Sequence, residues 1–402
     1  MRLPSAKPAL RKKHSSRPRI YRALAPGAFA TLISLIFLLL TVTARAADKT
    51  LSPGDPITAR PALYAQAGYI YNLRAPGNET ENKYRLEGSS GGASLDAVCL
   101  MLAKPSGSGL PGFALNLAAG SIPRDMNRQG KGVNGRVEND DPVDLLEARF
   151  FYDLPFAGGL KLGWGRAPAD LGAETLLTGL SPLYSHSFAY LLSEPMTLTG
   201  FAAELAFAGP FKAGLGLTNG LDAPIDGGDY RTGRLYFQYA PNERTRAGLN
   251  LLAGPADGPG ESGKRYLAVL SLSSDVTEAI SFAVGGDVGL YDLDGTGKTL
   301  PGGENKGAWW GLTLTGTWRI ADILSVSARG DYFADEEGTR TETHQRMHEM
   351  TFGAKARVTE GFFVMPEFRH DWSTKRIFSD ANGQPNRKGQ NTFSVGAVWN
   401  WP

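Results

Sequence analysis

Residues 307–319 read GAWWGLTLTGTWR, and they alternate between two kinds of side chain. In an extended strand, successive side chains point to opposite faces of the sheet. One face here is apolar and the other carries glycine and threonine, with Ala308, Trp310, Leu312, Leu314 and Trp318 opposite Gly311, Thr313, Thr315 and Thr317. The stretch predicts a β-strand with one apolar and one polar face.

A second stretch, LLEARFFYD at residues 145–153, shows the same alternation with charges on the polar face. Glu147 and Arg149 lie on one side, and Phe151 alone blurs the division. The apolar side is made of Leu146, Ala148, Phe150 and Tyr152. In a water-soluble sheet this apolar side would be buried, so the location of the protein decides which side faces outward.

Segments of this kind fill the chain after residue 47, where no long amphipathic helix and no run of 18 apolar residues occurs. Glycine is abundant, at 50 of 402 residues. We expect sixteen strands, at 62–73, 93–103, 112–120, 145–153, 159–166, 197–208, 211–218, 231–240, 245–253, 264–273, 279–291, 307–319, 323–334, 347–358, 362–373 and 391–401.

The connections between these segments alternate between long and short. Every odd-numbered connection has about ten residues or more, whereas every even-numbered one has about eight or fewer. Transmembrane β-barrels of bacteria have this arrangement, with long external loops and short periplasmic turns. The even number of strands also places both chain ends on the side of the short turns.

The polar faces indicate which side of each strand meets water. A soluble protein of this size would need some strands buried on both sides, and few of these strands are apolar on both. Because hydrocarbon offers no hydrogen-bond partners, only a helix or a closed barrel can span a membrane. The sequence therefore predicts an all-β fold, a transmembrane antiparallel β-barrel of about 16 strands over residues 62–402, with its apolar side chains outward.

The first 46 residues have the pattern of a secretory signal peptide. They hold nine of the 42 basic residues and none of the 40 acidic residues, so the exported chain has a formal charge of −7. The apolar run that follows the basic region is shorter than the roughly 20 residues of a membrane-spanning helix. We expect cleavage after Ala46, a short periplasmic segment at 47–61, a location in the outer membrane and no nucleic-acid partner.

Four stretches resemble the OmpL-like β-barrel porins of Gram-negative outer membranes. They are GWGRAPADLGAE (163–174), SHSFAYLLSEPMTLTG (185–200), GLGLTNGLD (214–222) and PEFRHDWS (366–373). The likeness covers most of residues 60–401 as a pattern. It implies a porin, whose water-filled lumen lets solutes cross the membrane.

The resemblance to porins also implies a constriction inside the barrel. In general porins the loop after the fifth strand, here 167–196, folds into the lumen, which points to Asp170 and Glu174 as its acids. Arg166 ends its strand, where alternation alone places it on the side of Trp164. We nevertheless include it. The other charged candidates for the pore lining are therefore Glu147, Arg149, Lys161, Arg166, Lys212, Arg329, Glu367 and Arg369.

The function that follows is passive diffusion of small hydrophilic solutes or ions, with outer-membrane lipid as the other partner. We expect no catalytic residues, metal site or cofactor: GTGKT (295–299) lacks the first glycine of a phosphate loop, and Cys99 is the single cysteine. The alternatives are a barrel enzyme that hydrolyses lipids and an exported β-rich adhesin. The sequence leaves open which solute passes and whether the barrel is a monomer or a homotrimer.

Overall fold

The computed structural model describes residues 60–73, 84–87, 91–107, 109–129, 131, 140–155, 159–207, 209–222, 231–255, 263–296, 299–301, 303–380 and 382–401. The predicted signal peptide, residues 1–46, and the segment that follows it up to residue 59 lie outside the described residues. Cleavage after Ala46 therefore stays a prediction.

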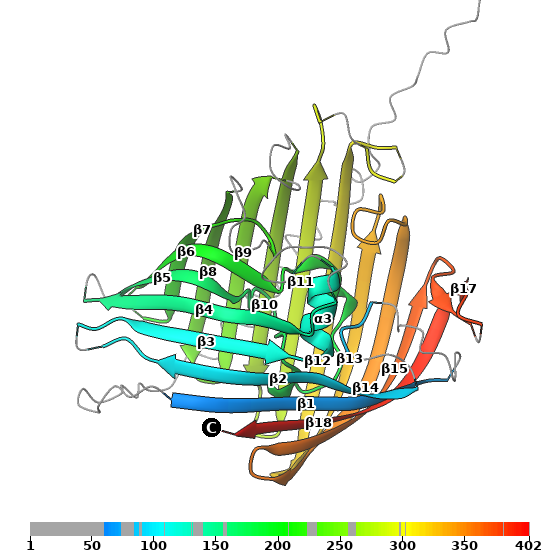
Figure 1. Cartoon of the computed structure of the whole chain (residues 1–402), viewed down its shortest axis with the longest axis horizontal. Helices are drawn as coiled ribbons and strands as arrows, with labels where there is room; N and C mark the ends of the chain where they lie inside the picture. The colour runs from blue at the N-terminus through cyan, green and yellow to red at the C-terminus, as the bar shows by residue number, and fades with distance from the viewer. Residues whose placement is uncertain are drawn as a thin grey trace, which may run out of the picture. The chain divides into compact units, whose positions relative to one another are not determined.

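Sixteen strands form a closed antiparallel barrel within the described part of the chain (Figure 1). Each predicted strand is found with ends that differ by no more than two residues. The strands are β1 (Arg60–Asn72), β2 (Gly92–Lys104), β3 (Gly112–Ala119), β4 (Val143–Leu154), β5 (Leu160–Pro168), β6 (Thr197–Ala206), β7 (Phe211–Thr218), β8 (Thr232–Asn242), β9 (Thr245–Pro255), β10 (Lys264–Asp275), β11 (Ile280–Asp292), β12 (Lys306–Ala321), β13 (Leu324–Asp335), β14 (Gln345–Thr359), β15 (Phe362–Ser373) and β18 (Gly389–Trp401). The predicted fold class is confirmed.

The barrel closes between its first and last strands. β1 pairs with β18 from Leu63 opposite Trp401 to Asn72 opposite Thr392, and β18 pairs with β15 on its other side. An open sheet would leave the backbone N–H and C=O groups of two edge strands without partners. Closure removes both edges, which is the condition for placing a sheet in hydrocarbon.

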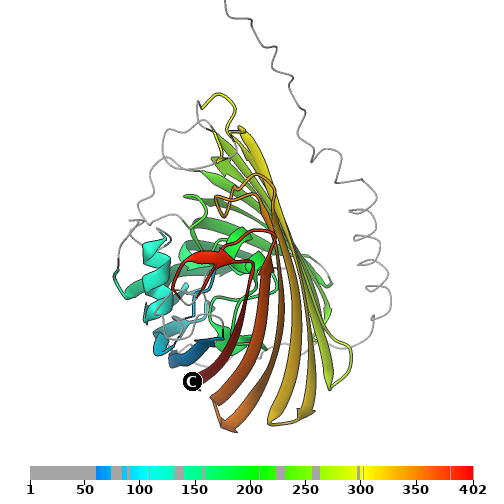
Figure 2. The same cartoon turned by 90° about the vertical axis from the view of Figure 1, so that its right-hand side faces the viewer.

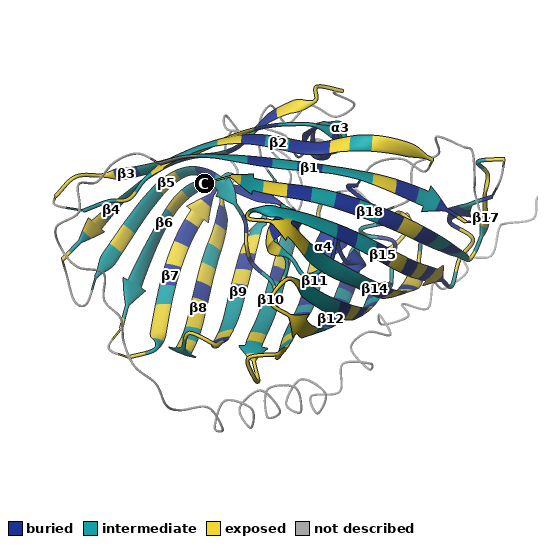
Figure 3. Ribbon diagram, turned by 90° about the horizontal axis from the view of Figure 1, so that it is seen from below, coloured by how far each residue is buried: buried dark blue, intermediate teal, exposed yellow. Residues whose placement is uncertain are grey.

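The two faces of the strands differ as the alternation predicts. On β12, Leu314 and Trp318 are 53% and 55% exposed on the outer surface, whereas Thr313 and Thr315 are 4% and 8% exposed. Buried and exposed bands alternate along the strands in Figure 3. Apolar side chains thus face outward, and the polar faces line the interior.

Short connections, such as 243–244 and 360–361, join strands at one end of the barrel, and the long connections lie at the other end. The long connections contain small elements that the strand pattern does not predict: α3 (Ser121–Arg128), η1 (Thr178–Leu180), α4 (Phe188–Ser193), and the hairpin of β16 (Phe378–Ser379) with β17 (Pro385–Arg387), drawn in red in Figure 2. None of the helices among the described residues has the length and apolar character needed to cross a membrane.

A β-bulge in β4 changes one predicted face. Asn116 of β3 lies opposite Glu147, but Leu117 lies opposite Leu145, which leaves Leu146 as an extra residue. Because an inserted residue shifts the alternation, Leu146 turns inward and is 1% exposed. The prediction that Leu146 lies on the outer face with Phe150 is wrong, while Phe150 itself is 64% exposed.

The orientation of the faces predicts opposite responses to an added charge. Leu215 is 58% exposed on the outer face of β7, and Gln238 is exposed on the inner face of the neighbouring strand β8. Leu215→Arg should lower the free energy of unfolding by ~2–4 kcal/mol, because arginine is costly in the bilayer midplane. Gln238→Arg should change it by less than ~0.5 kcal/mol. Urea unfolding of the protein folded into lipid vesicles measures both, and equal losses would contradict the outward orientation.

Candidate functional site: the infolded loop and the lumen

The segment between β5 and β6, residues 169–196, lies inside the barrel. Its backbone amides reach the far wall: Phe188 N–H donates to Asp331 Oδ2 at 2.9 Å. Tyr184 N–H and Ser185 N–H both donate to Glu367 Oε2, at 2.9 and 3.0 Å. Because β13 and β15 are far from β5 and β6 in the strand order, the segment crosses the lumen. We call it the infolded loop.

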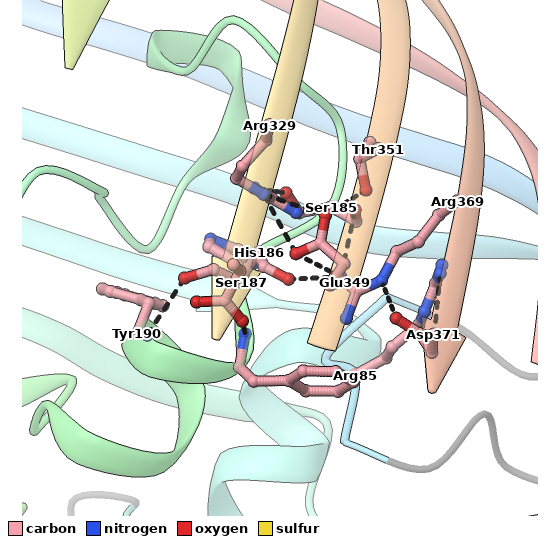
Figure 4. A network of polar contacts seen from close by, with 12 residues as sticks. Arg85, Ser185, His186, Ser187, Tyr190, Arg329, Glu349, Thr351, Arg369 and Asp371 are labelled. Atoms are coloured by element: carbon pink, nitrogen blue, oxygen red, sulfur yellow. Dashed lines mark hydrogen bonds and ion pairs between the residues drawn. The ribbon is translucent and has the colours of Figure 1, made fainter. Parts of the chain in front are cut away.

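Two arginines of the far wall hold the infolded loop in place (Figure 4). Arg329 pairs with Glu349 at 3.1 Å and donates to Ser185 O at 2.6 Å. Arg369 pairs with Asp371 at 2.6 Å and donates to the carbonyl oxygen of His186. These side chains are buried, and removing one partner of a buried ion pair typically costs ~3–5 kcal/mol. The network fixes the path of the loop.

His186 links the infolded loop to the first long connection. Its Nδ1 lies 2.7 Å from Glu87 Oε1, and its Nε2 lies 2.9 Å from the carbonyl oxygen of Thr175. Both partners are acceptors, so both ring nitrogens must carry protons, as in the imidazolium ion. Burial lowers the pKa of His186, but the hydrogen bond and the negative charge of Glu87 outweigh this effect, so the pKa is raised.

Glu87 responds in the opposite sense. Burial raises its pKa, but the hydrogen bond and charge of His186, together with neighbouring arginines, lower it to about 2. The pair is therefore ionised around neutral pH. Tyr190 stacks on the imidazole ring, with ring centroids 4.9 Å apart, and completes the enclosure of His186.

Apolar packing and glycines complete the contact between loop and wall. Phe188 and Trp309 belong to one buried cluster inside the barrel. At Gly311, a Cβ atom would lie 2.7 Å from the Cβ of Ala189, and at Gly396 it would lie 2.3 Å from the ring of Tyr184. Any larger residue at these two glycines would push the loop away from the wall.

The other side of the lumen stays open to water. Arg329, Glu349, Glu367 and Arg369 on the inner faces of β13–β15 are buried beneath the infolded loop, whereas several charged and amide side chains on the inner face of β4–β9 are exposed. The exposed set consists of Arg149, Lys161, Lys212, Gln238 and Arg246. The open part of the lumen therefore lies between the infolded loop and this wall.

Most charges along this open wall occur in neighbouring pairs. Arg149 lies 2.6 Å from Glu147, and Lys212 lies 3.4 Å from Glu204. Lys161 lies at a looser 3.9 Å from Asp153. Exposed pairs of this kind contribute little to stability. Their effect is to place alternating charges along the open wall.

The two acids predicted on the infolded loop have different surroundings. Asp170 is exposed at its surface. Because the surrounding barrel removes it from bulk water, its pKa is raised, and the positive charges of Arg149 and Arg234 oppose the rise. Glu174 is largely covered, accepts from Ser187 N–H at 3.1 Å and lies 3.3 Å from Arg329 Nη1. Asp170 therefore faces the open path, and Glu174 anchors the loop.

The remaining predicted lining residues divide in the same way. Glu147, Arg149, Lys161 and Lys212 lie on the open wall, while Arg329, Glu367 and Arg369 lie beneath the infolded loop. The sequence interpretation did not identify His186, Glu87 or Glu349 as anchoring residues. Glu349 follows the alternation of β14 and was within reach of that pattern, but the contact between His186 and Glu87 has no local signal.

Arg166 turns inward because of the residue that precedes it. Gly165 has a φ of 129°, and a Cβ there would lie 2.1 Å from the carbonyl oxygen of Ala148. This irregular backbone reverses the alternation that places Arg166 beside Trp164. Arg166 is 1% exposed, lies 3.5 Å from Asp144 and donates to Leu145 O at 3.0 Å.

Solved structures with the same fold are outer-membrane proteins. OmpT of Vibrio cholerae in a trimer form matches with a TM-score of 0.55 at 11% identity, over 86% of this chain and 99% of that one. The anion-selective porin of Comamonas acidovorans gives 0.56 at 13% identity, over 86% and 99%. OmpF of Salmonella typhi, in complex with daunomycin, gives 0.56 at 7% identity, over 85% and 97%. At these identities the likeness shows the fold alone.

The sequence comparisons identify the family. Among curated proteins, none matches the chain significantly. A family model described as "Putative beta-barrel porin-2, OmpL-like" matches residues 62–400, nearly the whole barrel. This agrees with the resemblance seen in the four sequence stretches. The chain belongs to the OmpL-like β-barrel porin-2 family.

Proposed function

We propose that the protein is a passive channel of the outer membrane for small hydrophilic solutes and ions. The observation that carries this proposal is the row of water-exposed charged side chains on β4–β9, opposite the infolded loop. If these side chains only filled the interior, they would be buried, as Arg329, Glu367 and Arg369 are beneath the infolded loop. Membership of a porin family supports the same conclusion.

The charges on the two sides of the path are arranged asymmetrically. The open wall presents bases at Arg149, Lys161, Lys212 and Arg246, and the loop presents the acid Asp170 across from it. Opposed charges across a narrow opening orient polar solutes and disfavour apolar ones. Selectivity between ions in such a path follows from the charges at its narrowest point.

The enzyme alternative has no support in the placement of Ser185 and His186. Both nitrogens of the imidazole point to Glu87 and Thr175, and not to a serine hydroxyl. The Ser185 hydroxyl accepts from Arg329 and Arg369, at 3.2 and 3.3 Å. A nucleophilic serine needs an adjacent base. These contacts favour a structural role.

The proposal includes the surroundings of the channel. The apolar outer face supports contact with outer-membrane lipid, and the trimer form of Vibrio cholerae OmpT motivates a homotrimer as the assembly.

Conductance of the purified protein in planar bilayers tests the proposed channel. We expect steady openings whose current is linear in voltage, because a water-filled path has no moving part in the way of the ions. Protein that inserts into the bilayer, as judged by protease protection, but conducts no current would refute the channel.

Asp170 should influence the preference between ions. Its φ of 40° is a left-handed conformation that Asn also adopts, so Asp170→Asn removes the charge without backbone strain. The permeability ratio of cation to anion should fall by up to about fivefold, since one unit charge at ~4 Å in water is worth about 1 kcal/mol. Reversal potentials in a salt gradient measure the ratio. The control Asp322→Asn removes the same charge from a turn outside the path and should leave the ratio unchanged.

The link between His186 and Glu87 should make the infolded loop sensitive to pH. The pKa of His186 is raised on folding. Its contribution to the free energy of unfolding is therefore complete below the ordinary pKa near 6.5 and is lost as pH rises through the raised value. The Glu87 contribution is present above its ordinary pKa and is lost only as pH falls toward about 2. Thermal unfolding in detergent should therefore show a Tm that declines on the alkaline side.

The variant His186→Gln separates this link from other titrating groups. It should show the lowered Tm already at pH 6 and a weaker decline above that pH. If the wild-type protein and the variant decline in parallel, the imidazolium does not hold the loop.

A further inference from the structure

A cavity of about 410 Å³ lies between the tip of the infolded loop and the inner wall near the short turns. The loop contributes Leu180 and Pro182, and the wall contributes hydroxyl and basic side chains from β9–β12 and β14. Its volume falls within the ~300–1,000 Å³ that is common for small-molecule sites. The cavity lies on the short-turn side of the infolded loop.

Leu180 is the unusual residue of this cavity. It is 76% exposed, although its neighbours Thr178 and Gly179 are buried against the wall. Burying a leucine side chain is worth ~1.5–3 kcal/mol. A loop that buries its other leucines fully or partly yet presents this one to the lumen offers an apolar contact to a solute.

A cation lies directly beside Leu180. Lys355 Nζ donates to the carbonyl oxygens of Gly179 and Ser181, at 2.7 and 3.2 Å, on either side of the leucine in sequence. An ammonium group has three donors, so one remains for a solute. The loop carbonyls also hold the lysine in position, which reduces the entropy lost when it binds a ligand.

A second cation faces the cavity from β9. Arg246 is exposed, lies opposite Ser273 on the inner face and has no ion-pair partner within the described residues. The neighbouring Arg244 is paired with Glu278 at 3.6 Å. Two acids, Glu243 and Asp275, line the cavity next to the turns, at its outer rim. The free guanidinium therefore lies deeper than the acids.

We propose that this cavity binds small organic carboxylates that carry an apolar group beside the carboxylate. Leu180 and Pro182 contact the apolar part, while Lys355 and Arg246 bind the carboxylate. Hydroxyl groups such as those of Ser273 and Thr317 provide further hydrogen bonds along the wall. This inference rests on the proposed channel and names a class of solute for it.

Saturation-transfer NMR on the purified full-length protein in detergent micelles tests the site without requiring conduction. The probes are phenylacetate, acetate, which lacks the ring, and phenethylamine, which reverses the charge. We expect phenylacetate to bind, and Arg246→Gln, Lys355→Met and Leu180→Ser each to weaken it about tenfold or more, as for loss of a charged hydrogen bond or an apolar contact. Acetate and phenethylamine should bind at least about tenfold more weakly than phenylacetate.

Matched variants remove the same groups elsewhere. Lys264→Met and Leu73→Ser change an exposed lysine and an exposed leucine at the long-loop end and should leave phenylacetate binding unchanged. Arg246 has no ion-pair partner to lose among the residues that the structure describes, so Arg246→Gln remains informative even if Lys355→Met releases the loop.

The outcomes separate the site from the channel. If the protein conducts ions but phenylacetate binds wild type and Arg246→Gln equally, the site is refuted and the channel stands. Variant-sensitive binding by a protein that does not conduct supports the site and refutes the channel. Stronger binding of phenethylamine than of phenylacetate would overturn the proposed class of solute.

Discussion

The fold depends on the pairing of every backbone N–H and C=O group where the barrel meets hydrocarbon. Water is absent there, so an unpaired group on an edge strand would cost several kcal/mol. The ladder between β1 and β18 satisfies this constraint by joining the two ends of the sheet. Once the sheet is closed, its two faces meet different solvents. Outward side chains such as Leu314 and Trp318 must be apolar, and the inward ones are free to be charged.

The infolded loop makes the interior of the barrel unequal. Its contacts with Arg329, Glu367 and Arg369 bury the charges of the far wall, where pairing offsets the cost of removing them from water. Side chains on the opposite wall, such as Arg149, remain exposed. The same residue types thus have two environments, buried beneath the loop and exposed on the wall opposite Asp170.

Periodicity in the sequence was sufficient to predict the barrel, because the alternation around residues such as Trp318 reports the solvent on each face. It failed where the backbone is irregular. Leu146 sits in a bulge, and Gly165 reverses the direction of Arg166; neither event changes the composition of its strand. The resemblance to porins was sufficient to place Asp170 and Glu174 on a loop toward the lumen. The different surroundings of these two acids, and the anchoring by His186, arise from contacts between distant segments that no local pattern encodes.

The wall recognises the infolded loop largely through its main chain. Glu367 and Asp331 accept from backbone amides of the loop, and Lys355 binds two of its carbonyl oxygens. Peptide groups are common to all amino acids, so such bonds fix the path of the loop backbone without specifying the side chain at each position. The side chain at position 180 could accordingly be exchanged while the trace of the segment persists. A scaffold of this kind leaves the protruding side chains of the loop free to vary, with no need to rebuild the support.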